Sequence, residues 1–326
     1  MLRAKIVATG SYVPERILNN ADLEGMVDTS DEWIIERTGI RERRIANDKQ
    51  AVSDLAYEAS KSALKSVGLR AKDLDLIIVA SVSGDMPLPA TACILQDKLD
   101  AGRAAAFDVN AACSGFVYAL SVADAFIRSG TYRRVLVVGA EVLSKFTDWE
   151  DRTTCVLFGD GAGAVILEAA EGDRGVLSVK IHSDGSMWDL LHVPAGGSRT
   201  PASRETVKKR MHFIKMKGNE TFKVAVRTLE SLVVETLKEH KLKSSDLSLL
   251  IPHQANFRII QATAKRLNLP MEKVVVNLDR FGNTSAASIP IALDETVKAA
   301  RVRNGDYILL EAFGGGLTWA SALIKW

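Results

Sequence analysis

Cys113 is the first residue whose position could support chemistry, because it lies where an apolar, strand-like segment meets a helix-like one. Residues 105–109 are mostly apolar, and the apolar residues after Cys113 recur at helical spacing. Unpaired N–H groups at a helix N-terminus stabilise a thiolate, the form of cysteine that attacks carbonyl carbons. The turn alone leaves this interpretation balanced against a buried structural cysteine. Cys93 and Cys155 lie in apolar segments, where we expect core packing.

His253 and Asn283 are the best candidates for partners of a nucleophilic cysteine. His253 directly follows the predicted strand 247–251, and residues at the carboxyl ends of strands lie over the site side of an α/β sheet. Asn283 lies in a glycine-flanked loop that enters a helix, and by itself such a loop could be only a turn and a helix cap. We expect the remaining histidines to be surface residues: His182, His192, His212 and His240.

Two glycine-rich segments have different meanings. The segment Phe158–Leu167 fits neither common phosphate-binding spacing and continues as a strand-like sequence, so nucleotide binding is not expected there. The segment Ala312–Ser321 follows the predicted strand 307–311 and contains three consecutive glycines. Because glycines let backbone N–H groups approach a ligand closely, this second segment could form an oxyanion hole.

The elements that must position these residues occur twice in the chain. The segment Leu64–Ala80 resembles Leu237–His253, and the two segments align without gaps at a constant offset in residue number. In each copy a small-residue turn, an alanine-containing helix, a glycine-containing loop and an apolar strand follow at a similar distance. The predicted strands are continuously apolar, which is typical of sheets covered by helices on both faces. We therefore expect two similar α/β halves that meet near residues 170–174, with a site between them.

The overall composition says little about which partners the protein binds. The chain has 326 residues, 47% of them hydrophobic, which is enough for a large core. Its 42 basic and 40 acidic residues nearly cancel, so no global field favours nucleic acid or a membrane surface. The N-terminal residues do not resemble a secretory signal and no apolar run could span a membrane, so we expect a cytoplasmic protein. Three unpatterned cysteines indicate neither a disulfide framework nor a zinc site.

Four separated segments together resemble the active-site segments of the thiolase superfamily, and most closely those of the β-ketoacyl-acyl carrier protein synthase III family. In chain order they are "NAACSGF", "PHQANFRI", "GNTSAAS" and "EAFGGGLTW". The resemblance extends over the whole chain. It implies an α/β fold of the thiolase type, a layered αβαβα arrangement of two duplicated halves: residues 1–172, carrying the cysteine, and residues 173–326, carrying the histidine and asparagine.

The resemblance also implies an acyltransferase that uses Cys113, His253 and Asn283. Cys113 would take a short acyl group, expected to be acetyl, from CoA. Malonyl-acyl carrier protein would then lose carbon dioxide and attack the acyl-cysteine, a decarboxylative Claisen condensation that starts fatty acid synthesis without a cofactor or a metal. His253 and Asn283 would stabilise the thioester enolate, and one such preorganised donor is typically worth ~3 kcal/mol. The backbone N–H groups of Cys113 and Gly315 would form the oxyanion hole.

Further positions match the substrate-binding residues of the family. Trp33 and Arg152 would enclose the adenine of CoA; alternatively, Trp33 packs under a helix that begins with the capping box Thr29–Glu32. Leu88 would gate the acyl site across the interface of an expected homodimer. The positions matched to CoA and substrate binding are Thr29, Trp33, Arg37, Leu88, Arg152, Leu157, Met216, Asn256, Arg258 and Phe313. Those matched to docking of the acidic carrier protein are Lys223, Gln254, Ala255, Asn256, Phe257, Arg258, Lys265 and Arg266.

Some residues separate this family from its relatives, and some leave alternatives open. A degradative thiolase would have a second cysteine where this chain has Phe313, and an elongating synthase would have a second histidine where it has Asn283. The loop Pro194–Met216 looks longer and more basic than in the family, and it could modify access to the site or be a flexible surface insertion. One alternative function is that of a related acyltransferase of secondary metabolism. A second is a non-catalytic module that binds acyl-CoA or the carrier protein, although the intact catalytic trio argues against it.

Overall fold

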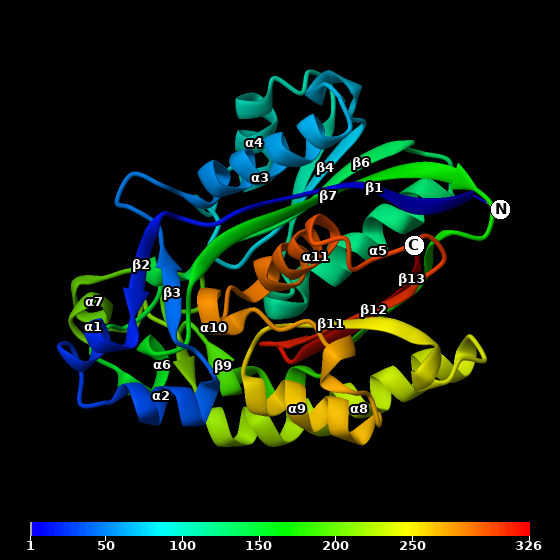
Figure 1. Ribbon diagram of the computed structural model, residues 1–326. Helices are drawn as coiled ribbons and strands as arrows, with labels where there is room; N and C mark the ends of the chain where they lie inside the picture. Colours follow the sequence, from blue (N-terminus) through cyan, green and yellow to red (C-terminus); the bar gives the residue numbers. More distant parts are fainter. Residues whose placement is uncertain (1) are drawn as a thin grey trace.

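The computed structural model describes residues 2–326 and contains two large sheets that lie face to face with helices between and outside them (Figure 1). The first sheet has the strand order β1-β7-β6-β4-β5, formed by Leu2–Tyr12, Asp160–Glu171, Arg134–Val142, Leu76–Ala80 and Ala105–Val109. The second sheet has the order β11-β12-β13-β8, formed by Leu247–Pro252, Tyr307–Gly314, Thr318–Lys325 and Gly175–Ser183.

The long helices complete five layers (Figure 1). The two central helices, α5 and α11, span Gly115–Arg128 and Ser288–Lys298 and share one buried cluster with the inner faces of both sheets. The outer face of the first sheet is covered by α3 and α4, which span Val52–Ser66 and Thr91–Leu99. The outer face of the second sheet is covered by α8 and α9, which span Gly218–Glu239 and Phe257–Arg266. The arrangement is the expected αβαβα layering.

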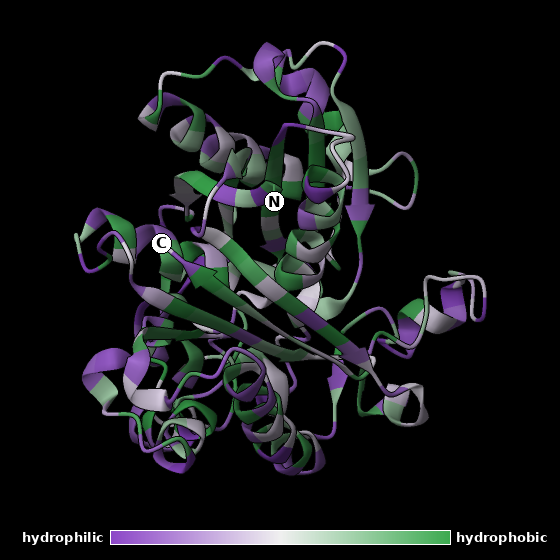
Figure 2. Cartoon of the chain, turned by 90° about the vertical axis from the view of Figure 1, so that its right-hand side faces the viewer, coloured by the Kyte–Doolittle hydropathy of each residue, from purple (hydrophilic) through white to green (hydrophobic). Residues whose placement is uncertain are grey.

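The sequence of β4 shows why both faces of a sheet are covered. All five of its residues are buried, and they alternate between two cores because successive strand side chains point to opposite faces. Leu76, Ile78 and Ala80 belong to the central core, whereas Ile77 and Val79 pack under α3 and α4. Figure 2 shows the same pattern for the whole chain, with hydrophobic residues concentrated in the sheets and hydrophilic ones on the outer segments.

The strand directions repeat between the two sheets. In the first sheet β1 and β7 are antiparallel, β7 and β6 are antiparallel, and β6, β4 and β5 are parallel. In the second, β8 and β13 are antiparallel, β13 and β12 are antiparallel, and β12 and β11 are parallel. A parallel bridge between Leu250 and Val274 stands where the second sheet would have a fifth strand. The duplicated fold predicted from the sequence repeat is thus confirmed, while the exact boundary between the halves, expected after residue 172, stays a prediction.

The shorter elements gather at the end of the molecule that carries the candidate site (Figure 1). They are β2 (Arg16–Asn19), α1 (Asn20–Glu24), α2 (Asp31–Thr38), β3 (Glu42–Ile45), α6 (Arg152–Cys155), β9 (Leu191–His192), α7 (Arg204–Lys208), β10 (Lys215–Met216) and α10 (Leu278–Phe281). The predicted capping box Thr29–Glu32 is not formed: the cap of α2 is Ser30, whose Oγ accepts the Trp33 N–H at 3.2 Å.

The two cysteines assigned to the core differ. Cys155 is fully buried, as predicted, whereas Cys93 is exposed. The prediction for Cys93 is wrong because α4 directs Ala92 and Leu95 inward, while Cys93 Sγ lies 3.7 Å from the Ala106 carbonyl of β5, an edge strand. No helix in residues 2–326 has the length and hydrophobicity needed to cross a membrane.

Candidate active site

Cys113 lies in a tight turn between β5 and α5, as the sequence predicts. A 3-10 turn spans Ala112–Ser114, and Ala112 takes a left-handed φ of 46°. α5 begins at Gly115, where a Cβ atom would lie 3.2 Å from the Cβ of Ala80. Cys113 is only 7% exposed but lines two separate cavities. The turn therefore presents a buried thiol to two spaces at once.

The expectation of an acidic thiol is wrong for this closed site. Burial raises the pKa of Cys113 to about 12, although a hydrogen bond from Ser285 acts in the opposite direction. The buried carboxyl group of Glu141 also raises it. Desolvation is the largest influence on this pKa, and it disfavours the thiolate. Burial in this closed site therefore opposes the thiolate form of Cys113.

His253 directly follows β11, and its backbone N–H donates to the Glu311 carbonyl of β12 at 2.7 Å. The Ser288 hydroxyl accepts the Gln254 N–H at 3.3 Å and lies 2.7 Å from His253 Nδ1. We assign the tautomer in which Ser288 donates to Nδ1 and the ring proton is on Nε2. Burial lowers the pKa of His253 to about 3, which keeps the ring neutral. His253 is therefore arranged as a neutral hydrogen-bond donor.

Asn283 lies in the loop between α10 and α11 and is held at three points. Its N–H donates to the Leu157 carbonyl at 2.8 Å, and its carbonyl accepts the Gly159 N–H at 3.0 Å. Its side-chain oxygen accepts the Ser285 N–H at 2.9 Å. Because the amide oxygen is occupied, Nδ2 remains as a donor toward the cavity that Asn283 lines.

The glycine-rich segment between β12 and β13 lies against the cysteine turn. A Cβ atom at Gly314 would lie 2.6 Å from the Cys113 nitrogen, so only glycine allows this approach. Gly315 lines the second cavity together with Cys113. The predicted proximity of the glycines and the cysteine is therefore present in the fold.

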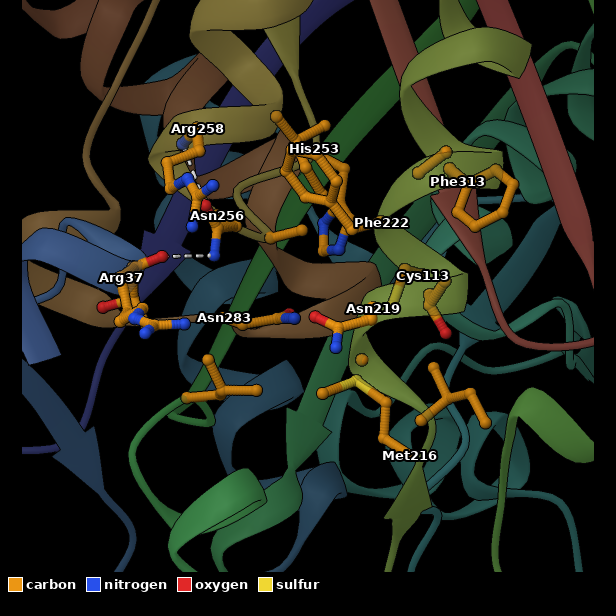
Figure 3. A pocket seen from close by; sticks show the side chains of 18 of the residues that line it. Arg37, Cys113, Met216, Asn219, Phe222, His253, Asn256, Arg258, Asn283 and Phe313 are labelled. Atoms are coloured by element: carbon orange, nitrogen blue, oxygen red, sulfur yellow. Dashed lines mark hydrogen bonds between the residues drawn. The ribbon is translucent and has the colours of Figure 1, made fainter.

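The first cavity has a volume of about 260 Å³ and takes residues from both halves (Figure 3). Cys113 comes from the first half, and His253 and Asn283 come from the second. Seven of the positions matched to CoA and substrate binding also line it: Trp33, Arg37, Leu157, Met216, Asn256, Arg258 and Phe313. Asn256 Nδ2 donates to the Arg37 carbonyl at 2.9 Å, which joins α9 to α2 at the cavity wall (Figure 3).

Three matched positions lie outside this cavity. The Arg152 guanidinium lies over the Trp33 ring at 5.1 Å and donates to the Asp28 carbonyl at 2.8 Å, so the two residues predicted to enclose adenine contact each other directly. The Thr29 hydroxyl is buried without a hydrogen-bond partner. Leu88 is 84% exposed and lines neither cavity in this single chain. Its gating role stays a prediction about a dimer.

The second cavity, of about 370 Å³, was not found by sequence reasoning. Its walls are largely apolar and include Val82, Leu143, Phe158, Trp188, Leu191, Val193 and Ile214. These residues look like ordinary core residues in the sequence, and only the fold brings them to Cys113. His192 also lines this cavity, and the His182 ring stacks on Trp319, so the expectation that both are plain surface residues is wrong.

The predicted carrier-docking residues fall into two groups. Lys223 on α8 and Arg258, Lys265 and Arg266 on α9 are exposed, and Arg266 pairs with Glu230. Ala255, Asn256 and Phe257 are half-buried. Gln254 is 1% exposed, and its side chain donates to the carbonyls of Pro252 and Val275, so its assignment to docking is wrong. Its amide is used inside the fold.

The loop Pro194–Met216 is attached to the site. Arg210 and Lys215 form ion pairs with the buried carboxylate of Asp148, and Arg210 in particular holds the pKa of Asp148 down at about 2. Ile214 is buried in the wall of the second cavity, and Met216 lines the first. The end of the loop therefore contributes to both cavities, whereas residues 201–205 are exposed, and the role of the loop stays a prediction.

Comparisons with known proteins agree with this geometry. Two family models match the chain: the one described as 3-oxoacyl-[acyl-carrier-protein (ACP)] synthase III over residues 107–185, and its C-terminal counterpart over residues 237–326. The chain is 56% identical to beta-ketoacyl-[acyl-carrier-protein] synthase III of Caldanaerobacter subterraneus subsp. tengcongensis, covering 100% of this chain and 98% of that protein. The chain belongs to the β-ketoacyl-acyl carrier protein synthase III family.

Other members of the synthase III family support the same assignment. The protein of that name from Xanthomonas campestris pv. campestris is 57% identical over 99% of this chain and 98% of its own length. The crystal structure of 3-oxoacyl-[acyl-carrier-protein] synthase III from Aquifex aeolicus VF5 superposes with a TM-score of 0.92 at 50% identity, covering 99% of this chain and 100% of that one. The chain is therefore an acyltransferase with the thiolase fold, a condensing enzyme that initiates fatty acid synthesis. Within residues 2–326, no group of three or more His, Cys, Asp or Glu side chains is arranged to hold a metal ion.

Proposed function

We propose that this enzyme transfers a short acyl group, acetyl first among them, from CoA to Cys113 and then condenses it with malonyl-acyl carrier protein. The observation that carries this proposal is the convergence of Cys113 with His253 and Asn283 at one cavity (Figure 3). A thiol alone could hold an acyl group, and two neutral donors alone could stabilise an enolate. Only the combination supports both halves of a condensation.

In the first half of the reaction, the thioester of the primer reaches Cys113 through the first cavity. The Cys113 sulfur attacks the carbonyl carbon, and the backbone N–H groups of Cys113 and Gly315 stabilise the oxyanion of the tetrahedral intermediate. The sulfur of CoA leaves with the electron pair of the broken C–S bond. The apolar second cavity, which Cys113 also lines, then receives the acyl chain.

In the second half, the malonyl thioester loses carbon dioxide, and the electrons of the broken C–C bond form a thioester enolate. The Nε2–H of His253 and the Nδ2–H of Asn283 donate to the enolate oxygen. Each preorganised donor of this kind typically contributes ~3 kcal/mol. Because the departure of carbon dioxide creates the carbon nucleophile, this step needs no strong base. The enolate carbon attacks the acyl-cysteine and releases the thiol.

The surroundings support the substrates and partners we propose. Trp33, Arg37 and Arg258 line the first cavity and suit the adenine and phosphates of CoA. Lys223, Arg258, Lys265 and Arg266 present positive charge beside it and suit the acidic carrier protein. The exposed Leu88 is compatible with a homodimer in which it gates the partner's acyl site. We further propose a cytoplasmic enzyme that needs no cofactor.

Incubation with labelled acetyl-CoA tests the proposal. The wild-type protein should retain one acetyl group per chain, detected by intact-protein mass spectrometry and located on Cys113 by peptide mapping. Cys113→Ser should retain no stable thioester, whereas Cys155→Ser, which changes a buried cysteine outside the cavities, should be acetylated normally. Equal labelling of Cys113→Ser and the wild type would overturn the assignment of the nucleophile.

A further inference from the structure

Arg43, on β3, is a fully buried cation that the proposed chemistry has not used. Its guanidinium donates to the Val156 carbonyl at 2.7 Å, to Asn20 Oδ1 at 2.8 Å and to the Leu18 carbonyl at 3.3 Å. All three of these acceptors are neutral, and Arg43 Nε is buried without a hydrogen-bond partner. Because burying a charge is costly and neutral acceptors offset that cost only in part, stability alone gives little reason for an arginine here.

The segment Val156–Gly159 connects this guanidinium to Asn283. Val156 accepts from Arg43, and the next carbonyl, that of Leu157, accepts the Asn283 N–H at 2.8 Å. The Gly159 N–H donates to the Asn283 carbonyl at 3.0 Å, so the segment and the asparagine form a short parallel bridge. A shift of the Val156 carbonyl would therefore be passed to the residue that fixes the Asn283 backbone.

The aliphatic part of Arg43 packs against glycines on both sides of this bridge. A Cβ atom at Gly159 would lie 3.2 Å from the Arg43 Cβ. A Cβ atom at Gly282, the residue before Asn283, would lie 3.3 Å from it. Gly282 also has a left-handed φ of 64°, a conformation that glycine adopts without strain. Arg43 thus contacts the Asn283 loop through its stem as well as through its guanidinium.

Asn20 extends these contacts to the wall of the first cavity. Its side-chain oxygen accepts from Arg43, while its Nδ2 donates to Asp31 Oδ1 at 2.8 Å. Asp31 is the first residue of α2, the helix that brings Trp33 and Arg37 to the first cavity. Arg43 therefore lies between the helix that we propose for CoA and the loop that we propose for decarboxylation.

We propose that Arg43 is a positioning residue for decarboxylation, which holds the Asn283 amide in place through the Val156 carbonyl and the two glycine contacts. Arg43 lines neither cavity, so it acts through another residue. A planar guanidinium holds several acceptors in fixed directions, which a lysine ammonium does not do. A donor that is displaced from the enolate oxygen stabilises the enolate less. Acylation depends on the Cys113 turn, which Arg43 does not contact.

This inference rests on the proposed role of Asn283, and its test uses Arg43→Met and Arg43→Lys. Carbon dioxide released from malonyl-acyl carrier protein measures decarboxylation, and intact mass measures acetylation of Cys113. Arg43→Met should lower the rate constant of decarboxylation at least about tenfold and keep acetylation within about threefold of the wild type. Arg43→Lys should recover part of that loss but remain at least about threefold slower than the wild type. Circular dichroism shows whether each variant is folded at the assay temperature.

Combining each variant with Asn283→Ala separates positioning from general destabilisation. If Arg43 acts through Asn283, its substitution should change decarboxylation by less than about twofold once Asn283 is alanine. A merely structural arginine would give the same loss in both backgrounds. If Arg43→Met does not fold, Arg43→Lys carries the same comparison.

Arg44→Lys is the matched control, because Arg44 is the next residue of β3 and donates instead to the Pro14 carbonyl at 3.4 Å. Its decarboxylation rate should equal that of the wild type. Wild-type decarboxylation in a folded Arg43→Met or Arg43→Lys protein would overturn the inference, and so would an undiminished loss in the Asn283→Ala background. Wild-type decarboxylation by Asn283→Ala itself would instead overturn the proposed function.

Discussion

The two turns that begin the central helices share a backbone and differ in chemistry. Ala112 and Ser285 are related by the same offset as the repeated segments, and both take a left-handed φ, 46° and 47°. Each begins a three-residue 3-10 turn, one in front of α5 and the other in front of α11. At the next position the first turn has Cys113 and the second has Ala286. The duplicated backbone therefore determines where a side chain is presented, and the residue type determines what it does there.

The neighbours of the two turns have diverged in the same way. In the first half, Ala80 at the end of β4 packs against Gly115, where a Cβ would lie 3.2 Å away. The matching positions of the second half, at the same offset, are His253 and Ser288, whose side chains form a hydrogen bond of 2.7 Å. An inert contact in one half corresponds to a polar pair in the other. The first half keeps the nucleophile, and the second half has gained the donors for the enolate.

The largest effect should come from exchanging the turn residues. Cys113→Ala should lower condensation by more than about a thousandfold, because the covalent step is removed. Adding Ala286→Cys to that variant should not restore turnover, since Ala286 is 1% exposed and lies against Gly139 and Gly115. Steady-state turnover and intact mass measure both. Acyl transfer to the double variant would show that the two turns are interchangeable.

Removing the polar pair of the second half should have the next largest effect. Ser288→Ala leaves the His253 tautomer unspecified, so malonyl decarboxylation should fall about tenfold to a hundredfold, as expected for a lost buried hydrogen bond of ~1–3 kcal/mol. Acetylation of Cys113 should stay within about twofold of the wild type, which is well below a loss of this size. Ser288→Thr, which retains a hydroxyl, should recover part of the loss. A loss shared equally by both half-reactions would contradict this division.

Adding a side-chain atom where the glycine segment contacts the cysteine turn should have a moderate effect. Gly314→Ala places a Cβ 2.6 Å from the Cys113 nitrogen, and overpacking of this kind costs about 1–3 kcal/mol of unfolding free energy. Acylation should slow more than decarboxylation, because the cysteine turn is displaced. Gly185→Ala is the control, since its Cβ would meet nothing within 4 Å. Denaturant unfolding and the two half-reactions together measure the effect.

The last effect, which is absent near neutral pH, should be a pH dependence of stability that belongs to the second half. Burial lowers the pKa of His253 from 6.5 to about 3, so between these values protons bind the unfolded chain and not the folded one. The contribution of His253 is therefore complete above about pH 6.5 and is lost as pH falls toward 3. His253→Gln should flatten the acid limb of unfolding free energy against pH. An unchanged slope would contradict a buried neutral histidine.

Most of the fold and the position of Cys113 could be predicted from patterns in the sequence. The continuous apolar strands and the internal repeat indicated the layered halves, because burial on both faces and duplication leave direct traces in the sequence. The junction of β5 and α5 indicated Cys113, because a strand-to-helix turn is a local feature. The strand pattern and the turn are local features, and the repeat is found by comparing two segments without knowing any contact between them.

The remaining features depend on contacts between distant segments. Gln254 looks like a docking residue beside Asn256, yet the carbonyl of Val275 and the N–H of Asn277 hold its side chain inside the fold. The thiol of Cys113 was expected to be acidic from its helix, whereas the burial supplied by both halves raises its pKa. The second cavity is made of apolar residues such as Leu143 and Ile214, which carry no polar signature in the sequence.

The central claim is that the first half holds the acyl group while the second half makes its carbon partner, and one measurement tests it most directly. His253→Ala and Asn283→Ala are each mixed with acetyl-CoA and then with malonyl-acyl carrier protein, while intact mass and released carbon dioxide are followed. The account predicts that both variants become acetylated on Cys113 and stay acetylated, with little carbon dioxide released. Loss of acetylation in either variant, with decarboxylation preserved, would contradict it.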